Sequence, residues 1–169
     1  VRANRGTLDQ LAIRPAASSE RCALNELARA SKAHWGYAAA QLEAWADDLT
    51  VSSHQIAKGW VMCAEVDGRI VGFFAIERDD DVAELDHLWV APDLIGQGLG
   101  RALFERAVRM ARQAGAHRLR VVSDPNALGF YTRMGAVIVG EYESTPVGRV
   151  LPVLSVDLTE PIALTSASS

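Results

Sequence analysis

Three glycines at every second position, Gly96, Gly98 and Gly100, form the segment of this chain best suited to bind a ligand. This glycine turn (residues 95–100) follows a strand-like run that ends at Val90 and leads into helical spacing from Leu99. Glycine has no Cβ atom, so the main chain can come close to a ligand there. The first turn of a helix also presents unpaired N–H groups and the positive end of the helix dipole, which together bind phosphate. The pattern therefore predicts a site for a ligand that carries phosphate.

A pair of carboxylates lies just before the glycine turn. Glu84 and Asp86 are two residues apart in one predicted strand, so their side chains share a face of it. A single acidic residue is most often solvated or paired with a cation. Two of them in an otherwise apolar strand, directly upstream of the turn, favour a role in proton transfer or substrate binding.

Two common nucleotide-binding motifs fit the glycine turn less well. The dinucleotide-binding motif has the pattern GxGxxG and an acidic residue about 20 positions further on. Here the spacing is GxGxG, and Asp124, at a suitable distance, is followed at once by proline. A P-loop is excluded because no Gly-Lys-Ser or Gly-Lys-Thr follows the turn.

The rest of the chain supplies the elements that must position these groups. Alternation and β-branched runs predict strands at 11–15, 60–66, 70–76, 82–90, 119–122, 137–142 and 150–158. Helices are predicted at 18–33, 38–48, 99–115 and 124–135, while 50–58 stays unassigned. The dipeptide Asp67-Gly68 suits the type I′ turn of a hairpin. This order predicts an α/β fold of α+β character, in which a mixed sheet carries helices on both faces.

The first two helices are each expected to bury one face. Ser18 or Ser19 is suited to cap the first helix, and Gly36 to end or kink it. Leu42 and Trp45 are expected to point inward from the second helix. The inward face of the first helix is expected to carry Cys22, Leu24, Leu27 and Ala28.

Length and composition are those of a single-domain globular protein. The 169 residues predict one domain over about 11–158, with flexible ends at 1–10 and 159–169. Hydrophobic residues make up 49% and charged residues 22%, which is typical of a soluble protein. The net charge of −4 offers no electrostatic footprint for nucleic acid. No apolar run approaches the roughly 20 residues of a membrane span, and none follows the two N-terminal arginines, so neither a membrane partner nor a signal peptide is expected.

Cysteine and histidine usage argues against structural cross-links and metals. Cys22 and Cys63 lie far apart without CxxC spacing, which favours a reduced, cytoplasmic protein. His87 is expected to be packed or hydrogen-bonded on the strand face opposite Glu84. The remaining histidines, which are scattered without the spacing of metal ligands, are His34, His54 and His117.

Two blocks of the sequence, in the right order, resemble the GNAT superfamily of N-acetyltransferases. The first block is Leu88-Trp89-Val90-Ala91-Pro92 followed by Gly96-Gln97-Gly98-Leu99-Gly100, which is similar to the family's acyl-CoA-binding core. The second is Asn126-Ala127, then Phe130-Tyr131, then Met134-Gly135-Ala136. The resemblance covers about residues 85–136. The family loop usually begins with Arg or Gln where this chain has Ile95, which leaves the backbone cradle intact.

The resemblance implies both a fold and a reaction. The fold is a mostly antiparallel central sheet of six to seven strands, splayed at the CoA site. The reaction is direct transfer of an acetyl group from acetyl-CoA to a primary amine in a ternary complex, without a metal. The residues that the resemblance implies for CoA binding are Leu88, Trp89, Val90, Ile95, Gly96, Gln97, Gly98, Leu99, Gly100, Arg101, Asn126, Phe130 and Tyr131.

The same resemblance assigns catalytic roles. The amine must lose a proton, because an ammonium with a pKa of about 10.4 is not a nucleophile. Glu84 and Asp86 match family positions that act on the amine through water, and Glu84 ranks first. The N–H of Val90 would stabilise the oxyanion, and Tyr131 would protonate the CoA thiolate. Asn126 would bind the pantetheine arm. The structural alternatives are packing for Tyr131 and helix capping for Asn126.

The acceptor is left open by the sequence. Candidate acceptor-site residues are Lys32, His34, Trp35, Tyr37 and Arg149, and the first four could equally form a hydrophobic plug. A small amine, an amino acid, an antibiotic and a peptide amine all fit, and a cationic acceptor is weakly favoured. The length of the acyl group and the formation of a homodimer are open as well. A non-catalytic acyl-CoA-binding module is the rival reading, and the presence of Tyr131, Glu84 and Asp86 argues against it.

Overall fold

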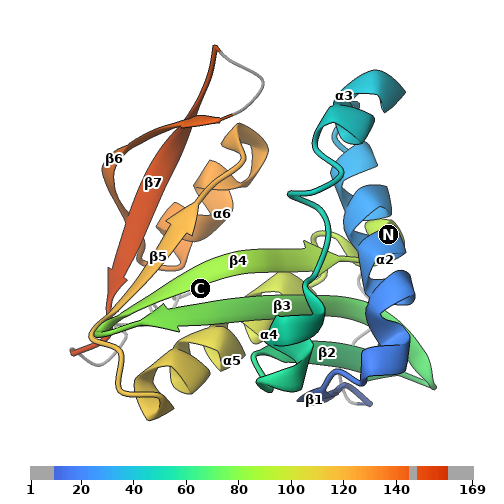
Figure 1. The fold of residues 1–169 in the computed structure, drawn as a ribbon, viewed down its shortest axis with the longest axis horizontal. Helices are drawn as coiled ribbons and strands as arrows, with labels where there is room; N and C mark the ends of the chain where they lie inside the picture. The colour runs from blue at the N-terminus through green and yellow to red at the C-terminus, as the bar shows by residue number, and fades with distance from the viewer. Residues whose placement is uncertain (1–9, 145–147, 160–169) are drawn as a thin grey trace, which may run out of the picture. The chain divides into compact units, whose positions relative to one another are not determined.

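The computed structural model describes residues 10–144 and 148–159 (Figure 1). Its sheet has seven strands in the order β1-β2-β3-β4-β5-β7-β6. The strands are β1 (Ala12–Pro15), β2 (Val61–Val66), β3 (Arg69–Asp79), β4 (Val82–Val90), β5 (Arg118–Val122), β6 (Val137–Ser144) and β7 (Arg149–Asp157). The helices are α2 (Arg21–Ala33), α3 (Ala39–Ala44), α4 (Ser53–Ala57), α5 (Leu99–Gln113) and α6 (Leu128–Arg133). Short 3₁₀ turns are η1 (Ser18–Glu20), η2 (Pro92–Leu94) and η3 (Pro125–Ala127). The predicted mixed α/β fold with a mostly antiparallel sheet is confirmed.

The chain forms two compact units. The first unit holds the chain up to Glu77 together with Asp86–Ala107. The second holds Arg78–Leu85 together with the chain from Val108. The predicted flexible ends, 1–10 and 159–169, lie outside the described residues except for Gln10 and Thr159.

The first unit is built on the predicted hairpin. Val66 pairs with Arg69 across a turn in which Asp67 has φ 50° and Gly68 has φ 76°. Positive φ at both central residues is the requirement of a type I′ turn, so that prediction is confirmed. Strand β1 pairs antiparallel with β2, with Ile13 opposite Ala64.

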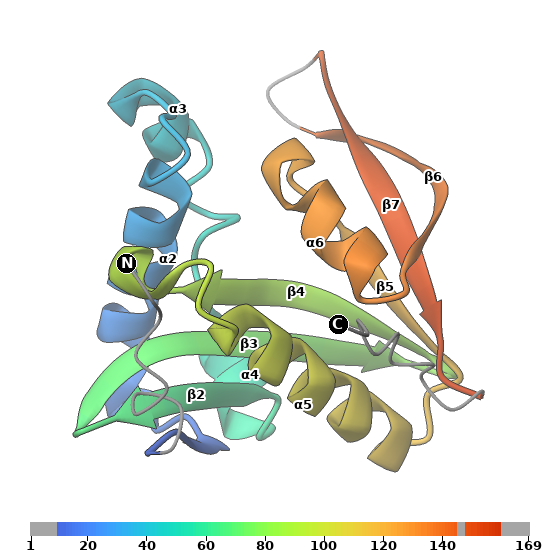
Figure 2. The same ribbon diagram turned by 180° about the vertical axis from the view of Figure 1, so that it is seen from behind.

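Helices cover both faces of the strands in the first unit (Figures 1 and 2). On one face, Phe73 packs into a cluster with Leu24 of α2 and Ile56 of α4. On the other face, a Cβ atom added to Gly72 would lie 2.9 Å from Leu103 Cδ1 of α5. The neighbouring strand residues Gly72 and Phe73 therefore face different helices, as alternation requires.

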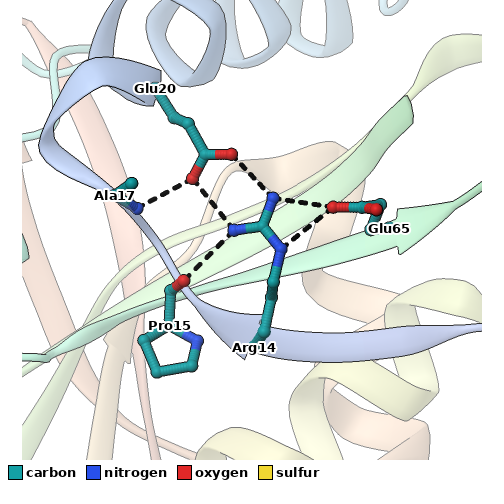
Figure 3. Close-up of polar contacts among 5 residues, drawn as sticks. All are labelled: Arg14, Pro15, Ala17, Glu20 and Glu65. Carbon is teal, nitrogen blue, oxygen red and sulfur yellow. Dashed lines mark hydrogen bonds and ion pairs between the residues drawn. The ribbon is translucent and has the colours of Figure 1, made fainter. Parts of the chain in front are cut away.

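Arg14 ties the start of α2 to the hairpin (Figure 3). Its Nη2 lies 2.6 Å from Glu20 Oε1 and 2.7 Å from Glu65 Oε2. Glu20 also accepts a 2.7 Å hydrogen bond from the N–H of Ala17. These bonds, the Arg14 guanidinium first among them, lower the pKa of Glu20. One arginine thus joins β1, η1 and β2.

Three details of the first helices differ from the sequence prediction. Neither Ser18 nor Ser19 caps the helix: the N-cap of η1 is Ala17, whose N–H donates to the Glu20 carboxylate, and the N-cap of α2 is Glu20. Cys22 is exposed, and the inner face is completed by Ser31 and Lys32. The unassigned segment 50–58 contains α4, in which Ser52 and Gln55 form a capping box.

The second unit combines three strand pairings. Val82–Glu84 of β4 run parallel to Arg118–Arg120 of β5, with Glu84 opposite Arg120. Strand β7 pairs antiparallel with β5 on one side and with β6 on the other. Strand β6 is one of the two edge strands of the sheet, and Val137, Ile138 and Val139 on it are all more than half exposed. None of the helices in the described part of the chain is long and apolar enough to cross a membrane.

Candidate active site

The glycine turn holds its main chain open at the start of α5. Gly96 has φ 81° and Gly98 has φ 89°, a backbone conformation that residues with a Cβ atom rarely adopt. The carbonyl of Gly98 accepts the first helical hydrogen bond, from Ala102 N–H at 3.1 Å. The N–H groups of Leu99, Gly100 and the residue after them therefore have no acceptor within the helix. Gly96 and Gly98 are exposed, so this open main chain fits a phosphate.

Packing beneath the turn fixes the start of α5. Leu99 is 2% exposed and Leu103 fully buried. A Cβ atom on Gly72 of β3 would lie 2.9 Å from the carbonyl oxygen of Trp89 as well as from Leu103. Gly72 is thus needed for the close approach of β3, β4 and α5, and the sequence analysis missed it. The signal available was a glycine inside an otherwise apolar stretch of strand, residues 70–76.

Polar side chains around the turn are engaged with one another. Arg69 donates two 2.9 Å hydrogen bonds to the carboxylate of Asp93, which lowers the pKa of Asp93. Gln97 Nε2 donates to the carbonyl of Asp93 at 2.9 Å. Arg101 Nε pairs with Glu105 at 2.8 Å one helical turn on. The ion pair with Arg69 offsets the charge of Asp93, a carboxylate close in sequence to the turn.

Asp86 is exposed and held by a buried glutamine. Gln55 of α4 is 6% exposed and donates from Nε2 to Asp86 Oδ2 at 2.6 Å. The other end of the same amide, Oε1, accepts the N–H of Ser52 at 3.2 Å. Gln55 therefore links the first turn of α4 to the strand that carries Asp86.

His87 is a buried neutral imidazole, as the packed or hydrogen-bonded prediction required. It is 6% exposed, and its Nδ1 accepts the indole N–H of Trp89 at 3.1 Å. The ring lies 5.9 Å from that of Phe73. Burial lowers the pKa of His87 to about 4. This side chain supports the strand and is not exposed to a substrate.

Glu84, in the second unit, is bound to a cation. Arg120 Nη1 lies 2.8 Å from Glu84 Oε1, and both side chains are about one third exposed, at 40% and 31%. Within residues 10–144 and 148–159, the structure gives Glu84 Oε2 no hydrogen bond. Burial along β4 alternates, with Ala83, Leu85 and His87 buried and Glu84 and Asp86 less so.

Tyr131 is enclosed in the second unit. It is 6% exposed, and its ring meets that of Phe130 edge-on at a centroid distance of 5.1 Å. Burial raises the pKa of the Tyr131 hydroxyl well above its ordinary value. The hydroxyl therefore keeps its proton at neutral pH, which is the state of a hydrogen-bond donor or acid.

Asp124 organises the start of η3. Its Oδ1 accepts from Asn126 N at 2.9 Å and from Asn126 Nδ2 at 3.0 Å. Its Oδ2 accepts from Arg149 Nη2 at 3.0 Å. The helix cap is therefore Asp124, and Asn126 is the residue that it holds, which corrects the capping alternative for Asn126. Asp124 also ties down Arg149, a residue predicted for the acceptor site.

The predicted acceptor cluster divides into a packed part and an exposed part. Lys32 is 7% exposed, with Nζ 4.9 Å from the Tyr37 ring centroid and 5.0 Å from that of Trp45. The two rings meet edge-on at 5.0 Å, and Trp45 belongs to the core. Trp35, by contrast, is 43% exposed beside His34. The packed part is a buried cluster in which the Lys32 ammonium makes cation–π contacts with Tyr37 and Trp45. The exposed part, Trp35 beside His34, is open to solvent.

The residues predicted for the site fall into two sets. The set in the first unit comprises Lys32, His34, Trp35, Tyr37, Asp86, Leu88, Trp89, Val90 and the glycine turn with Arg101. The set in the second unit comprises Glu84, Asn126, Phe130, Tyr131 and Arg149. Among the described residues there is no group of three or more His, Cys, Asp or Glu side chains that could hold a metal ion.

Parts of this sequence are similar to known proteins. The model of the acetyltransferase (GNAT) family matches residues 23–136, more than half of the chain. An uncharacterized N-acetyltransferase of Methanocaldococcus jannaschii is 33% identical over 87 residues, which are 46% of this chain and 38% of that protein. A peptidyl-lysine N-acetyltransferase of Escherichia coli (strain K12) is 32% identical over 111 residues, 64% of this chain and 69% of that protein.

Solved structures share the fold. The PaiA N-acetyltransferase of Thermoplasma acidophilum, in complex with coenzyme A, has a TM-score of 0.72 at 18% identity and covers 87% of this chain and 98% of its own. The ribosomal-protein-S18-alanine N-acetyltransferase of Escherichia coli has a TM-score of 0.66 at 18% identity, with 88% and 94% covered.

Proposed function

The chain belongs to the GNAT family of acetyltransferases, and we propose that it transfers the acetyl group of acetyl-CoA to a primary amine. The observation that supports this most is the glycine turn at the start of the 15-residue helix α5. Gly96 and Gly98 take positive φ there and are exposed, and the first N–H groups of α5 have no acceptor within the helix. A pyrophosphate is the ligand that suits such a main-chain cradle. Two neighbours of similar fold have coenzyme A or acetyl-CoA bound.

Acetyl-CoA supplies the acetyl group as a thioester. The side chains of this chain are proposed to transfer protons and to bind the charged acceptor. Glu84 is the proposed base, acting through water on the amine. Its ion pair with Arg120 engages Oε1 at 2.8 Å. Asp86 is the proposed site for the cationic acceptor, because its carboxylate is exposed. In this proposal Glu84 removes the proton from the amine, and Asp86 orients the acceptor.

Tyr131 is the proposed acid for the CoA thiolate. Burial holds its hydroxyl protonated at neutral pH, which an acid needs before it can donate. The N–H of Val90 is the proposed oxyanion donor, and Asn126 the proposed partner of the pantetheine arm. Asn126 is exposed and oriented by Asp124, so its side chain has a fixed starting position.

The acceptor is proposed to be an amine that arrives as a cation. One relative is named for peptidyl lysine and one structural neighbour for the alanine of a ribosomal protein, so peptide amines belong in the first screen. Thiol release from acetyl-CoA should be measured with small amines, amino acids, aminoglycosides, a lysine peptide and an N-terminal alanine peptide. Amine-dependent release is expected with at least one class. A protein that binds CoA by calorimetry yet releases thiol with none would be the non-catalytic acyl-CoA-binding module.

A further inference from the structure

Glu84 and Arg120 lie opposite each other on two neighbouring parallel strands. They are register partners in the pairing of β4 with β5. Neighbouring strands lie about 4.8 Å apart, so side chains on the same face of a sheet reach each other. Arg120 Nη1 donates to Glu84 Oε1 at 2.8 Å. Both residues belong to the second unit, so the contact is formed within one compact part of the chain.

Strand β5 fixes the backbone from which Arg120 extends. The strand lies between β4 and β7 in the sheet. The residues on either side of Arg120, Leu119 and Val121, are only 1% and 4% exposed, so close packing holds the strand in place. On β7 the register partner of Arg120 is Ser155, which carries no charge. Of the two register partners of Arg120, Glu84 is therefore the charged one.

The ion pair engages one of the two oxygens of the Glu84 carboxylate. An ionised carboxylate accepts hydrogen bonds at both oxygens. Arg120 occupies Oε1, and in the part of the chain that the structure describes Oε2 accepts no hydrogen bond. The bond to Oε1 therefore sets the direction in which Oε2 points. The Glu84 side chain is 31% exposed, so water has access to it. A base that acts through water needs an oxygen that is both accessible and held in one direction.

We propose that Arg120 is a positioning residue that orients the Glu84 carboxylate for its role as the base. The inference rests on the proposed function and adds to it a residue 36 positions away from Glu84 along the chain. Glu84 Oε1 stays bound to Arg120, while Oε2 accepts a hydrogen bond from the water next to the amine. The ammonium gives its proton to that water as the water gives one of its own to Oε2, so Glu84 ends the step protonated.

The decisive variant is Arg120→Met, which keeps a long side chain and removes every donor. In steady-state rates of thiol release we expect kcat to fall about 10-fold or more, because a hydrogen bond to a charged group is lost and the carboxylate is free to turn. The KM for the amine should not rise, and CoA affinity should stay within about twofold, since Arg120 is proposed to bind neither ligand. The ion pair is partly exposed, so the variant should melt close to the wild type.

Arg120→Lys tests whether a donor alone restores the rate. The structure shows one hydrogen bond from Arg120 to Glu84, through Nη1, and the ammonium of a lysine also provides a charged donor. The kcat of Arg120→Lys should therefore return to within about threefold of the wild type. A kcat as low as that of Arg120→Met would contradict the inference.

Arg118→Met is the matched control. Arg118 lies two residues before Arg120 on β5, so both side chains share a face of the strand. Arg118 is exposed, and its register partner on β4 is Val82, which carries no charge. The change removes the same charge from the same strand and should leave kcat within about twofold of the wild type. An equal fall of kcat in both variants, or an unchanged or higher kcat in Arg120→Met, overturns the inference.

A double variant tests whether Arg120 acts through Glu84. In a Glu84→Gln background, Arg120→Met should lower kcat no further, because there is no carboxylate left to orient. A further fall of kcat in the double variant overturns the inference. An active enzyme whose kcat is unchanged by Glu84→Gln overturns it as well.

Failure of the inference and failure of the proposed function give different results. Wild-type protein that releases no thiol with any amine overturns the proposed function. Crystal structures of the wild type and of Arg120→Met then test the orientation directly. A Glu84 carboxylate that changes direction in the variant supports the orienting role of Arg120, and one that keeps its direction overturns it.

Discussion

The glycine turn and the carboxylate segment of β4 (residues 84–89) are close in sequence but are built in opposite ways. The turn relies on its own main chain, with positive φ at Gly96 and Gly98 and with the N–H groups of the first turn of α5, which have no acceptor within the helix. The carboxylate segment relies on side chains from elsewhere, since Glu84 is bound by Arg120 and Asp86 by Gln55. Chemistry done by the main chain is encoded locally, whereas chemistry done by side chains depends on distant partners.

The largest effect is expected from a change in the glycine turn, where the main chain is proposed to bind the ligand. Gly98→Val puts a β-branched side chain at φ 89° and should displace the N–H groups around it. Loss of two hydrogen bonds to a charged phosphate, at about 1.5–3 kcal/mol each, should weaken CoA binding by about 10²–10⁴-fold. Titration calorimetry with CoA measures this.

Gly59→Val separates strain from binding. Gly59 has φ 72° and open space around its Cβ position, so it carries a similar conformational cost away from the turn. It should lose stability and keep CoA affinity. A folded Gly98→Val protein with unchanged affinity would show that the turn is not the phosphate cradle.

Tyr131→Phe extends the comparison to a buried side chain of the second unit. The change removes one hydroxyl and keeps the ring, so kcat should fall by about 10²–10⁴-fold while CoA affinity stays the same. Steady-state rates of thiol release test this. Tyr142→Phe, at a residue that is 50% exposed on β6, is the control and should leave the rate unchanged. Equal rates in both variants would leave Tyr131 with a packing role alone.

Glu84→Gln tests whether the carboxylate segment supplies the base. The change keeps the shape and removes the proposed base, so kcat should drop by about 10²-fold in steady-state rates of thiol release. Glu43, which pairs with Arg29 and is 75% exposed, provides the matched change Glu43→Gln, which should leave kcat unchanged. An unaltered kcat in Glu84→Gln would assign proton removal to another group.

The carboxylate segment should also make stability depend on pH. Burial lowers the pKa of His87 from 6.5 to about 4, so an unfolded chain binds this proton before the folded protein does. This contribution to stability is therefore complete above the unfolded pKa of about 6.5 and is lost as the pH falls towards the folded value. The loss should be about 3 kcal/mol in the free energy of unfolding, measured with urea across this range.

His87→Gln keeps an acceptor for the indole N–H of Trp89 and does not titrate. Its free energy of unfolding should therefore fall less steeply between these pH values. If the free energy of unfolding falls equally steeply with pH in the variant and the wild type, groups other than His87 cause the pH dependence of stability.

The smallest effect is expected at the surface of the glycine turn. Arg69 and Asp93 are 58% and 56% exposed, and exposed ion pairs contribute at most about 1 kcal/mol. Arg69→Ala should change the melting temperature only slightly and leave CoA affinity within about twofold, because the main chain forms the turn. A large loss of affinity would mean that side chains, and not the main chain alone, hold the turn in place.

The parts of the fold that the sequence predicted correctly are those with local determinants. The Asp67-Gly68 hairpin follows from turn chemistry within four residues, and the range 82–90 for β4 follows from its flanking turns. Asp67 adopts φ 50° because the I′ turn requires it. In such places the nearest neighbours in sequence decide the structure.

The parts that could not be predicted depend on tertiary contacts. The bond from Gln55 joins residues 31 apart, and that from Arg120 joins residues 36 apart. Nothing in either local sequence identifies the partner. The capping box of Ser52 and Gln55 was a usable local signal for α4. Ser18 and Ser19 show the reverse, since two residues of a good capping type lie inside the short turn η1 and do not cap α2.

The edge strand β6 has a consequence for how this protein behaves at high concentration. Val137, Ile138 and Val139 are exposed on the outermost strand of the sheet, where a further strand could add. The register shifts between Ile138 and Gly140, and Glu141 and Glu143 are exposed further along the strand. A bulge and repelling charges both oppose edge-to-edge pairing of molecules. Resistance to edge-to-edge aggregation therefore depends on the bulge and on two glutamates, and replacing both glutamates would leave the bulge to oppose intermolecular β-sheet growth along this edge.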